Sequence, residues 1–339
     1  MRIYFMPNLS RGGNSGPANV DTKLWKHWPE DDELRCSQEH GLRHVIEIIR
    51  DVVWGDCVVA DGWGRSQEIA QRACHLLNRR FVCITHGWLP YENEVNGLGF
   101  SEDQMRKCDS FMGRCNAIAA VSRLQAEFDA AQLPGMEARI SWFFNGVEGR
   151  EPIQHQRIGH LVVSVSGGTR PIKRNDIVAD ACELLREKGI GLELRVYGRD
   201  YAGDTSWLAR PGVRYMGQVA QDEFLAGLAE TDVFVMASLH ESFGLSAIDA
   251  LQAGASLLIS DTCGVADTLA LQDGDVVSHE ASPELIADRI MALYKYPNAG
   301  RLAASIDYGH YSWDAAAKRL RAICAGEGGY PLVSEKGKD

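Results

Sequence analysis

The sequence lacks several features that mark particular protein classes. No apolar run among its 339 residues approaches the length of about 18 residues that a transmembrane helix needs. An excess of basic residues is also missing, because the formal net charge is −11, and no general attraction to nucleic acid is expected. The chain begins MRIYFMPN, which reads as a short strand rather than a signal peptide. We therefore expect a cytoplasmic protein with no nucleic-acid partner and no transmembrane segment.

Cysteine is present in the wrong pattern for a disulfide framework or a zinc site. The nine cysteines are odd in number and no two of them stand in C-x-x-C spacing. Several, such as Cys57 and Cys83, lie within apolar runs. We expect buried free thiols and no bound metal.

The chain length and the alternation of expected strands and helices indicate two α/β domains. A chain of this length suits two domains of roughly 150 residues each. Short buried strands alternate with helices throughout, as in doubly wound parallel sheets. One of the expected helices, residues 41–50, carries Leu42, Val45, Ile46 and Ile49 on one face, which predicts that this face packs on the core.

The segment 231–264 is the most informative part of the chain. An apolar strand, 233–237, breaks into a polar loop with Glu241, and a helical pattern follows up to Gly254 before a second strand, 257–259. Ligands of open α/β sheets bind at the carboxyl ends of such strands. The amides of Phe243, Gly244 and Leu245 at the helix start suit a phosphate. Asp249 lies eight residues beyond Glu241, slightly over two helical turns along the same edge.

These residues resemble the donor-binding signature of retaining GT-B glycosyltransferases of the large fourth family. The matching residues are Glu-Ser-Phe-Gly-Leu at 241–245, Ala-Gly at 253–254 and Ser-Asp at 260–261. The resemblance implies that Glu241 contacts the donor sugar and that Asp249 contacts the ribose hydroxyls. Asp249 is a departure, because the family has glutamate there. Without the resemblance, both carboxylates could simply belong to a solvated helix start.

The first half of the chain also follows the family order. His86 follows a strand, as does the family histidine near the transferred sugar, and the Gly12-Gly13 loop after the first strand is expected to face the substrates. Asn145-Gly146-Val147 marks the crossing to the second domain. A structural histidine and a plain glycine turn remain the alternatives for His86 and for Gly12 and Gly13.

In the second half, the resemblance implies a phosphate site and a base site. The family supplies an Arg and a Lys to the donor diphosphate, but Gly167-Gly168 occupies the usual Arg position. Lys173 is the preferred phosphate residue and Arg170 the substitute for the missing arginine, both through charge-assisted hydrogen bonds, and a basic helix start paired with Asp176 is the alternative. Met216 and Gly217 stand where similar proteins hold the nucleotide base.

The resemblance as a whole implies two Rossmann-like domains facing across a cleft. We expect residues 1–150 plus a returning helix, 309–325, to form the acceptor-side domain. Residues 151–308 are expected to bind the nucleotide sugar, and 326–339 to be a disordered tail.

The predicted activity is retaining transfer of a hexose from a nucleoside-diphosphate sugar, UDP or GDP, to a saccharide, glycolipid or small-molecule hydroxyl. Glu241, His86 and Lys173 are the expected catalytic residues, with no cofactor and no metal, since Asp273-Gly274-Asp275 reads as a turn. A non-catalytic nucleotide-sugar binder and a GT-B sugar-nucleotide epimerase are the alternatives. A basic group on the segment 101–114 could touch a membrane peripherally, but we favour a solvated face.

Overall fold

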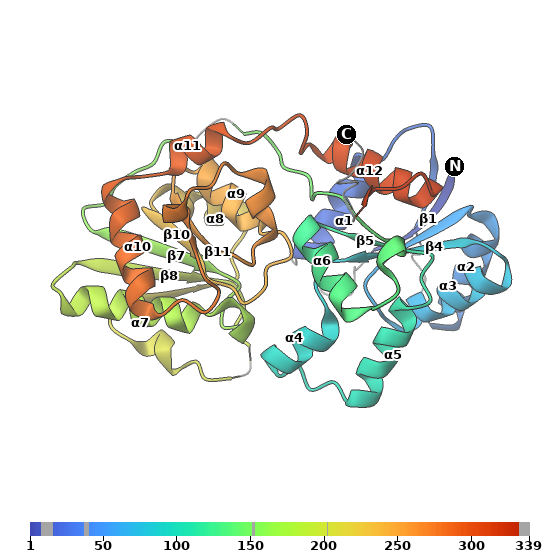
Figure 1. Cartoon of the computed structure of the whole chain (residues 1–339), viewed down its shortest axis with the longest axis horizontal. Helices are drawn as coiled ribbons and strands as arrows, with labels where there is room; N and C mark the ends of the chain where they lie inside the picture. The colour runs from blue at the N-terminus through green and yellow to red at the C-terminus, as the bar shows by residue number, and fades with distance from the viewer. Residues whose placement is uncertain (8–15, 37–40, 151–152, 202, 332–339) are drawn as a thin grey trace. The chain divides into compact units, whose positions relative to one another are not determined.

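The computed structural model describes residues 1–7, 16–36, 41–150, 153–201 and 203–331. It divides into two compact units (Figure 1). Unit 1 comprises Met1–Pro90, Phe100–Glu148 and the chain from Tyr308, and unit 2 comprises Tyr91–Gly99 and Gly149–Asp307. Each unit is an α/β structure built on one sheet, which confirms the expected fold class.

Unit 1 is built on a seven-stranded sheet in the order β13-β6-β5-β4-β3-β1-β2. All neighbours pair in parallel except β13, which runs antiparallel to β6. The strand order changes direction between β1 and β3, so ligands are expected outside the carboxyl ends of these strands. The strands are β1 (Arg2–Met6), β2 (Glu33–Arg35), β3 (Cys57–Asp61), β4 (Arg80–Thr85), β5 (Ala117–Ala120), β6 (Ile140–Trp142) and β13 (Tyr330–Pro331).

The helices of unit 1 come from both ends of the chain. The last helix, α12, drawn in red among the blue and green elements of unit 1 (Figure 1), contacts α1, β3, β4 and β5. Gly146 admits Trp313 of α12, because a Cβ at Gly146 would overlap the indole ring. The helices are α1 (Gly16–Lys26), α2 (Gly41–Trp54), α3 (Arg65–Leu76), α5 (Glu102–Met112), α6 (Arg123–Gln132) and α12 (Trp313–Ala325), with a 3-10 turn η2 (Glu137–Arg139).

Two expectations for unit 1 are wrong. Helix α2 does not bury the predicted stripe: Ile46 is 70% exposed and Ile49 40%, whereas Ile48 is fully buried. The tail after residue 326 is not wholly disordered either, because Tyr330 pairs with Trp142 as part of β13. Its ring stacks on the Trp142 indole with centroids 4.4 Å apart, and this contact helps hold the strand.

Unit 2 is built on a six-stranded parallel sheet in the order β12-β11-β10-β7-β8-β9. Numbered from the first strand of the unit, this is the order 3-2-1-4-5-6 of dinucleotide-binding folds, with its switch point between β7 and β10. The strands are β7 (Leu161–Ser166), β8 (Leu192–Tyr197), β9 (Val213–Gly217), β10 (Val233–Met236), β11 (Ser256–Ser260) and β12 (Val276–Val277).

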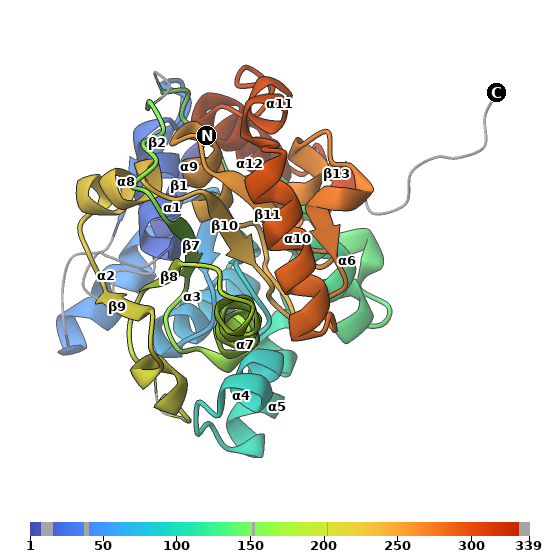
Figure 2. The same ribbon diagram turned by 90° about the vertical axis from the view of Figure 1, so that its left-hand side faces the viewer.

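Helices cover both faces of this sheet. Figure 2 looks onto unit 2, where α7 and α10 pack against each other and bury Val178, Leu185 and Ile290 in the core. Helices α8 and α11 both contact α9. The helices are α4 (Leu89–Asn96, which begins in unit 1), α7 (Asn175–Glu187), α8 (Gln221–Ala229), α9 (Leu245–Gln252), α10 (Pro283–Lys295) and α11 (Ala299–Ala304). Four 3-10 turns accompany them: η3 (Pro171–Lys173), η4 (Ser206–Ala209), η5 (Gly264–Thr268) and η6 (Asp273–Asp275).

The chain passes between the two units at more places than the boundary expected near residue 150. Residues 91–99, expected in the N-terminal domain, group with unit 2. The backbone N–H of Ile172 donates to the Asn96 side chain at 3.0 Å, and the Tyr91 ring packs edge-on to His240. These side-chain contacts account for the excursion, which a reading based on strand order alone could not reveal.

Some smaller expectations are also decided by the structure. All nine cysteines are free thiols, and each except the half-buried Cys36 is buried. Asp275 belongs to the Asp-Gly-Asp segment that we did not expect to bind metal. Its carboxylate accepts hydrogen bonds from Asn298 at 2.7 Å and Arg301 at 2.6 Å. Within the described residues, no helix is long and apolar enough to cross a bilayer.

Candidate functional site

The loops after β7 and β10 leave the sheet of unit 2 at its switch point. The loop after β7 contains Gly167, Gly168, Arg170 and Lys173, and the loop after β10 contains Glu241. Parallel strands bring their carboxyl ends to the same edge, so residues 68 positions apart in the chain meet here. The predicted phosphate and sugar residues therefore belong to one place in the fold.

The glycine pair after β7 is required by close backbone approach. Gly168 has a positive φ of 63°, and a Cβ there would overlap the carbonyl oxygen of Arg199. The buried side chain of Asn175 fixes the loop by donating to the carbonyls of Ser166 at 3.1 Å and Gly168 at 2.7 Å. At Gly167 a Cβ would lie 2.7 Å from Cγ of Lys173, so glycine gives this lysine room to lie across the loop.

Lys173 and Glu241 form an ion pair at this edge. Lys173 ends the turn η3, and its ammonium donates to Oε2 of Glu241. The backbone of Glu241 is fixed on both sides, since its N–H donates to the Thr262 carbonyl and its carbonyl accepts from the Gly264 N–H, each at 2.9 Å. Burial opposes ionisation of Glu241, but the charge and hydrogen bond of Lys173 and the charge of Arg170 outweigh it and lower the pKa of Glu241. Glu241 is therefore a carboxylate at neutral pH.

Helix α9 begins directly beyond Glu241. Gly244 precedes its first residue with a φ of 102°, a conformation that L side chains rarely adopt. A Cβ there would lie 3.1 Å from the Met236 sulfur and 3.4 Å from Cγ of Glu241, so glycine leaves room for both side chains. The first amides of a helix have no partner within it, and the helix dipole is positive at this end. An anion is thus favoured beside Glu241.

His240 contributes an uncharged imidazole next to this pair. Its pKa is lowered to about 4, chiefly because burial disfavours the charged ring; the positive charge of Lys173 acts in the same direction, against the opposing effect of Glu241. His240 was not among the site residues predicted from the sequence. Its position directly before Glu241 was visible, but the burial that keeps the ring neutral was not.

The two arginines of the η3 loop have different surroundings. Arg174 lies in the left-handed region with a φ of 52° and donates to the carbonyls of His279 and Ala281, so its guanidinium supports the fold. Arg170 lies with its guanidinium 5.6 Å from the ring centroid of Tyr201, and its charge helps to lower the pKa of Glu241. A cavity of about 300 Å³ adjoins the loop, lined in part by Thr169, Arg170, Asp204 and Trp207.

Asp249 has protein partners on both oxygens. Arg150 pairs with Oδ1 at 3.3 Å, and the side-chain amide of Gln221 donates to Oδ2 at 3.1 Å. Sequence reasoning missed both residues. Arg150 stands 99 positions away from Asp249, just after the Asn145-Gly146-Val147 crossing between the domains, and no local pattern marked it.

The remaining predicted donor residues lie at the end of β9 or outside the described residues. Gly217 has a φ of 70°, and its carbonyl accepts from the Gly198 N–H at 2.8 Å. Met216 and Gly217 are half-buried. Gly12 and Gly13 fall within 8–15, outside the residues that the structure describes.

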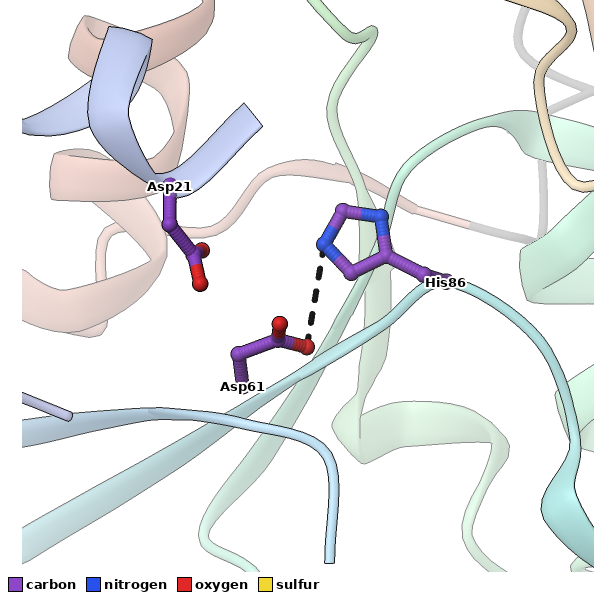
Figure 3. A group of neighbouring side chains, drawn as sticks. All are labelled: Asp21, Asp61 and His86. Atoms are coloured by element: carbon purple, nitrogen blue, oxygen red, sulfur yellow. Dashed lines mark ion pairs between the residues drawn. The ribbon is translucent and has the colours of Figure 1, made fainter. Parts of the chain in front are cut away.

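Unit 1 carries a separate group of side chains at the carboxyl edge of its sheet. His86 follows β4, and its Nε2 lies 3.7 Å from Oδ1 of Asp61, the last residue of β3 (Figure 3). Asp21 from α1 completes the group, and the candidate ligand atoms of the three residues lie within 4.8 Å of one another. Burial lowers the pKa of His86, while the negative charge of Asp21 acts in the opposite direction. His86 was expected from the sequence, whereas Asp21 and Asp61 were not selected.

The chain is similar in sequence and in fold to known glycosyltransferases. Residues 159–296 match the family described as Glycosyl transferases group 1. A glycogen synthase from Syntrophotalea carbinolica is 31% identical over 163 residues, which cover 42% of this chain and 33% of the relative. An uncharacterized glycosyltransferase from Methanocaldococcus jannaschii is 29% identical over 126 residues, 35% of this chain and 32% of the relative. The chain thus spans about a third of the length of these curated relatives.

Among solved structures, Anabaena Alr3699/HepE in complex with UDP-glucose matches with a TM-score of 0.74 and 14% identity, covering 96% of this chain and all of that one. Sucrose-phosphate synthase from Thermosynechococcus elongatus gives a TM-score of 0.69 at 12% identity, with 96% and 99% coverage. These likenesses concern the fold. Residues 159–296 are therefore similar to group 1 glycosyltransferases, and the chain as a whole has the fold of GT-B glycosyltransferases.

Proposed function

We propose that the protein is a retaining glycosyltransferase that moves a hexose from a nucleoside-diphosphate sugar to an acceptor hydroxyl. Unit 2 would bind the donor, with UDP or GDP as its nucleotide, and unit 1 would receive a saccharide, glycolipid or small-molecule acceptor. The resemblance of residues 241–261 to the retaining family supports retention, and the UDP-glucose complex of a protein with a similar fold supports the donor class.

The observation that carries the proposal is the Lys173–Glu241 ion pair at the start of α9. A diphosphate placed there would accept hydrogen bonds from the Lys173 ammonium and from the first amides of the helix. Once Lys173 turns toward phosphate, Glu241 can accept hydrogen bonds from sugar hydroxyls. Arg170 adds positive charge next to the pair. The two residues would thus exchange their mutual contact for contacts with the two halves of the donor.

The chemistry asked of this site is stabilisation of a leaving group. The bond between the sugar C1 and the diphosphate oxygen breaks, and the negative charge that develops on the diphosphate meets Lys173, Arg170 and the helix amides. The acceptor oxygen bonds to C1 on the face that the diphosphate leaves, and its proton passes to the departing phosphate. No metal or cofactor is needed for this scheme, in keeping with the prediction from the sequence.

A thermal-shift comparison with UDP, GDP and ADP tests donor binding. A nucleotide at a hundredfold over its Kd should add about 2.7 kcal/mol to the free energy of unfolding. Lys173→Ala should weaken the shift, whereas Lys188→Ala, an exposed lysine of the same unit, should leave it unchanged. Equal shifts in both variants would remove Lys173 from the phosphate site.

Transfer itself is tested with the nucleotide sugar whose nucleotide binds. Glu241→Ala should retain the fold and lower turnover at least tenfold, about 1.4 kcal/mol in the barrier. Product analysis by NMR should show the donor's anomeric configuration preserved. An inverted product would contradict retention, and binding without transfer would favour the non-catalytic nucleotide-sugar binder.

A further inference from the structure

Helices α2 and α3 of unit 1 lie against each other (Figure 1). Near their amino ends, His44 Nε2 and the Ser66 hydroxyl share a hydrogen bond of 2.9 Å. Near their carboxyl ends, the guanidinium of Arg79, shortly after α3, donates to the Val53 carbonyl at 3.2 Å. The two helices therefore run in the same direction, and Val53 lies beside the end of α3.

Exposed aliphatic side chains are concentrated on this helix pair. Of the eleven large apolar residues that are exposed in the described part of the chain, six belong to α2 or to the end of α3. Isolated exposed aliphatic residues are ordinary, but a group of them on two contacting helices indicates an interaction surface. The six are Val45, Ile46, Ile49, Val53, Leu76 and Leu77.

The charges that this helix pair presents to solvent are positive. Residues 41–54 and 65–80 contain six arginines and three acidic residues, although the whole chain has a net charge of −11. Each acidic side chain pairs with an arginine that extends further into solvent: Glu47 and Asp51 with Arg50, and Glu68 with Arg72. The face therefore favours an anionic partner. A second copy of the same face would bring arginines against arginines.

A small cavity beside the end of α3 provides a place for an anionic group. Its volume is about 70 Å³, which leaves room for a group the size of several waters. A phosphate group has about this size. The residues that line the cavity are Gln71, Cys74, His75, Asn78, Arg79, Phe81, Arg114 and Asn116. No acidic side chain is among these described residues.

Two arginines supply the positive charge of the cavity. Arg114 donates from Nε to the Gln71 side-chain oxygen at 3.3 Å and from a terminal nitrogen to the Ser110 hydroxyl at 2.5 Å. Arg79 is held by the Val53 carbonyl. These acceptors are uncharged, so both guanidiniums keep charge for an anion. Asp56 is near enough to interact with the charge of Arg79, but its carboxylate pairs with Arg2 at 2.7 Å.

We propose that this face of unit 1 binds the surface of a membrane that contains anionic phospholipid. A lipid phosphate occupies the cavity at Arg79 and Arg114, and the exposed side chains of α2 and α3 enter the apolar layer beneath the headgroups. A phospholipid joins a phosphate to apolar chains, and this matches a cationic cavity next to exposed Val53 and Leu76. A soluble phosphate would fill the cavity but leave the aliphatic side chains in water.

The charge requirement is tested by cosedimentation of the full chain with vesicles in the absence of nucleotide. The wild type should bind vesicles of phosphatidylcholine mixed with phosphatidylglycerol more tightly than phosphatidylcholine alone, and less tightly as salt is added. Arg114→Gln should weaken binding to the mixed vesicles about fivefold. Arg106→Gln is the matched control and should leave binding unchanged. Arg106 is an exposed arginine of the same unit, but its charge is balanced by Glu102 and Asp103 within α5.

The apolar contact is tested by Leu76→Ser, which should weaken binding to the mixed vesicles roughly tenfold, because the leucine no longer enters the apolar layer. The Leu76 side chain is 83% exposed, so the variant should unfold at the same temperature as the wild type. Leu285→Ser changes an exposed leucine on α10 of unit 2 and should bind vesicles like the wild type.

Several results would overturn the proposal. These are equal binding to the two kinds of vesicle, equal effects of Arg114→Gln and Arg106→Gln, and a wild-type dimer in sedimentation equilibrium that Leu76→Ser dissociates. Binding of free glycerol phosphate without binding to vesicles would make the cavity a site for a soluble phosphate ester and would also overturn it. Vesicle binding requires no sugar transfer, so these results stand apart from the test of the proposed function.

Discussion

Asp129 is a carboxylate buried in unit 1 and held by neutral donors. The Thr85 hydroxyl and the Gln125 side-chain amide each donate to it at 2.6 Å. Complete burial raises the pKa of Asp129 to about 7 despite these hydrogen bonds. The folded protein therefore binds this proton more tightly than the unfolded chain, and stability is lost as pH rises from about 4 to about 7.

Asp129→Asn removes this titration while keeping both hydrogen bonds feasible, since the Thr85 hydroxyl can also accept. The free energy of unfolding of the variant minus that of the wild type should rise between pH 4 and pH 7, by roughly 2–4 kcal/mol, and level off above. Denaturant unfolding across this pH range measures the difference. The remaining carboxylates titrate in both proteins, so their effects cancel in the difference. If the free energies of unfolding of the two proteins changed in parallel with pH, the raised pKa of Asp129 would be contradicted.

Residues of the site were predictable where the signal is local. Glu241 and Gly244 stand within one short strand–loop–helix segment, whose residue types already specify a positive φ and a carboxylate at a strand end. Arg150 and Asp61 were not predictable in their roles. Their importance comes from partners brought to them by the fold, Asp249 from 99 positions away and His86 from the next strand, and no spacing in the sequence encodes such a meeting.

At the scale of elements, α2 shows why periodicity can select the wrong face. Apolar residues occur on two sides of this helix, and sequence alone favoured the side with Ile46 and Ile49. The structure buries Ile48 and Val52 instead, where α2 contacts β1 and α3. The type and place of the helix were predictable from its pattern, but the buried side depended on which neighbours it meets.

This difference predicts contrasting effects from one residue type in one helix. Ile48→Ala should lower the free energy of unfolding by about 2–4 kcal/mol, because it leaves a cavity against the sheet. Ile46→Ala removes the same atoms from a side chain that is 70% exposed and should change stability by less than about 0.5 kcal/mol. Chemical denaturation of the two variants is the measurement, and equal losses would mean that Ile46 is buried in solution.

At the scale of the whole molecule, unit 1 is completed by α12 and β13, which come from the C-terminal part of the chain. The alternation of strands and helices in two domains was visible in the sequence, whereas the strand order of each sheet is known only from the structure. The excursion of residues 91–99 into unit 2 and the pairing of β13 with β6 were not visible, because each depends on contacts with residues far along the chain. The returning helix is another such contribution, since α12 contacts three strands of unit 1.

Leu320 of α12 is fully buried, so Leu320→Ala should cost about 2–5 kcal/mol through lost burial and a cavity. Hydrogen exchange can place that loss within the molecule. Exchange should accelerate in β3 and β4, more than two hundred residues earlier in the sequence but in the same unit, while β7 of unit 2 keeps its protection. The control is Leu285→Ala, which truncates a leucine that is 41% exposed on α10. This variant should change neither the free energy of unfolding nor the exchange of β3 and β4. Equal acceleration in β7 would mean that the two units unfold as one cooperative body rather than as separate units.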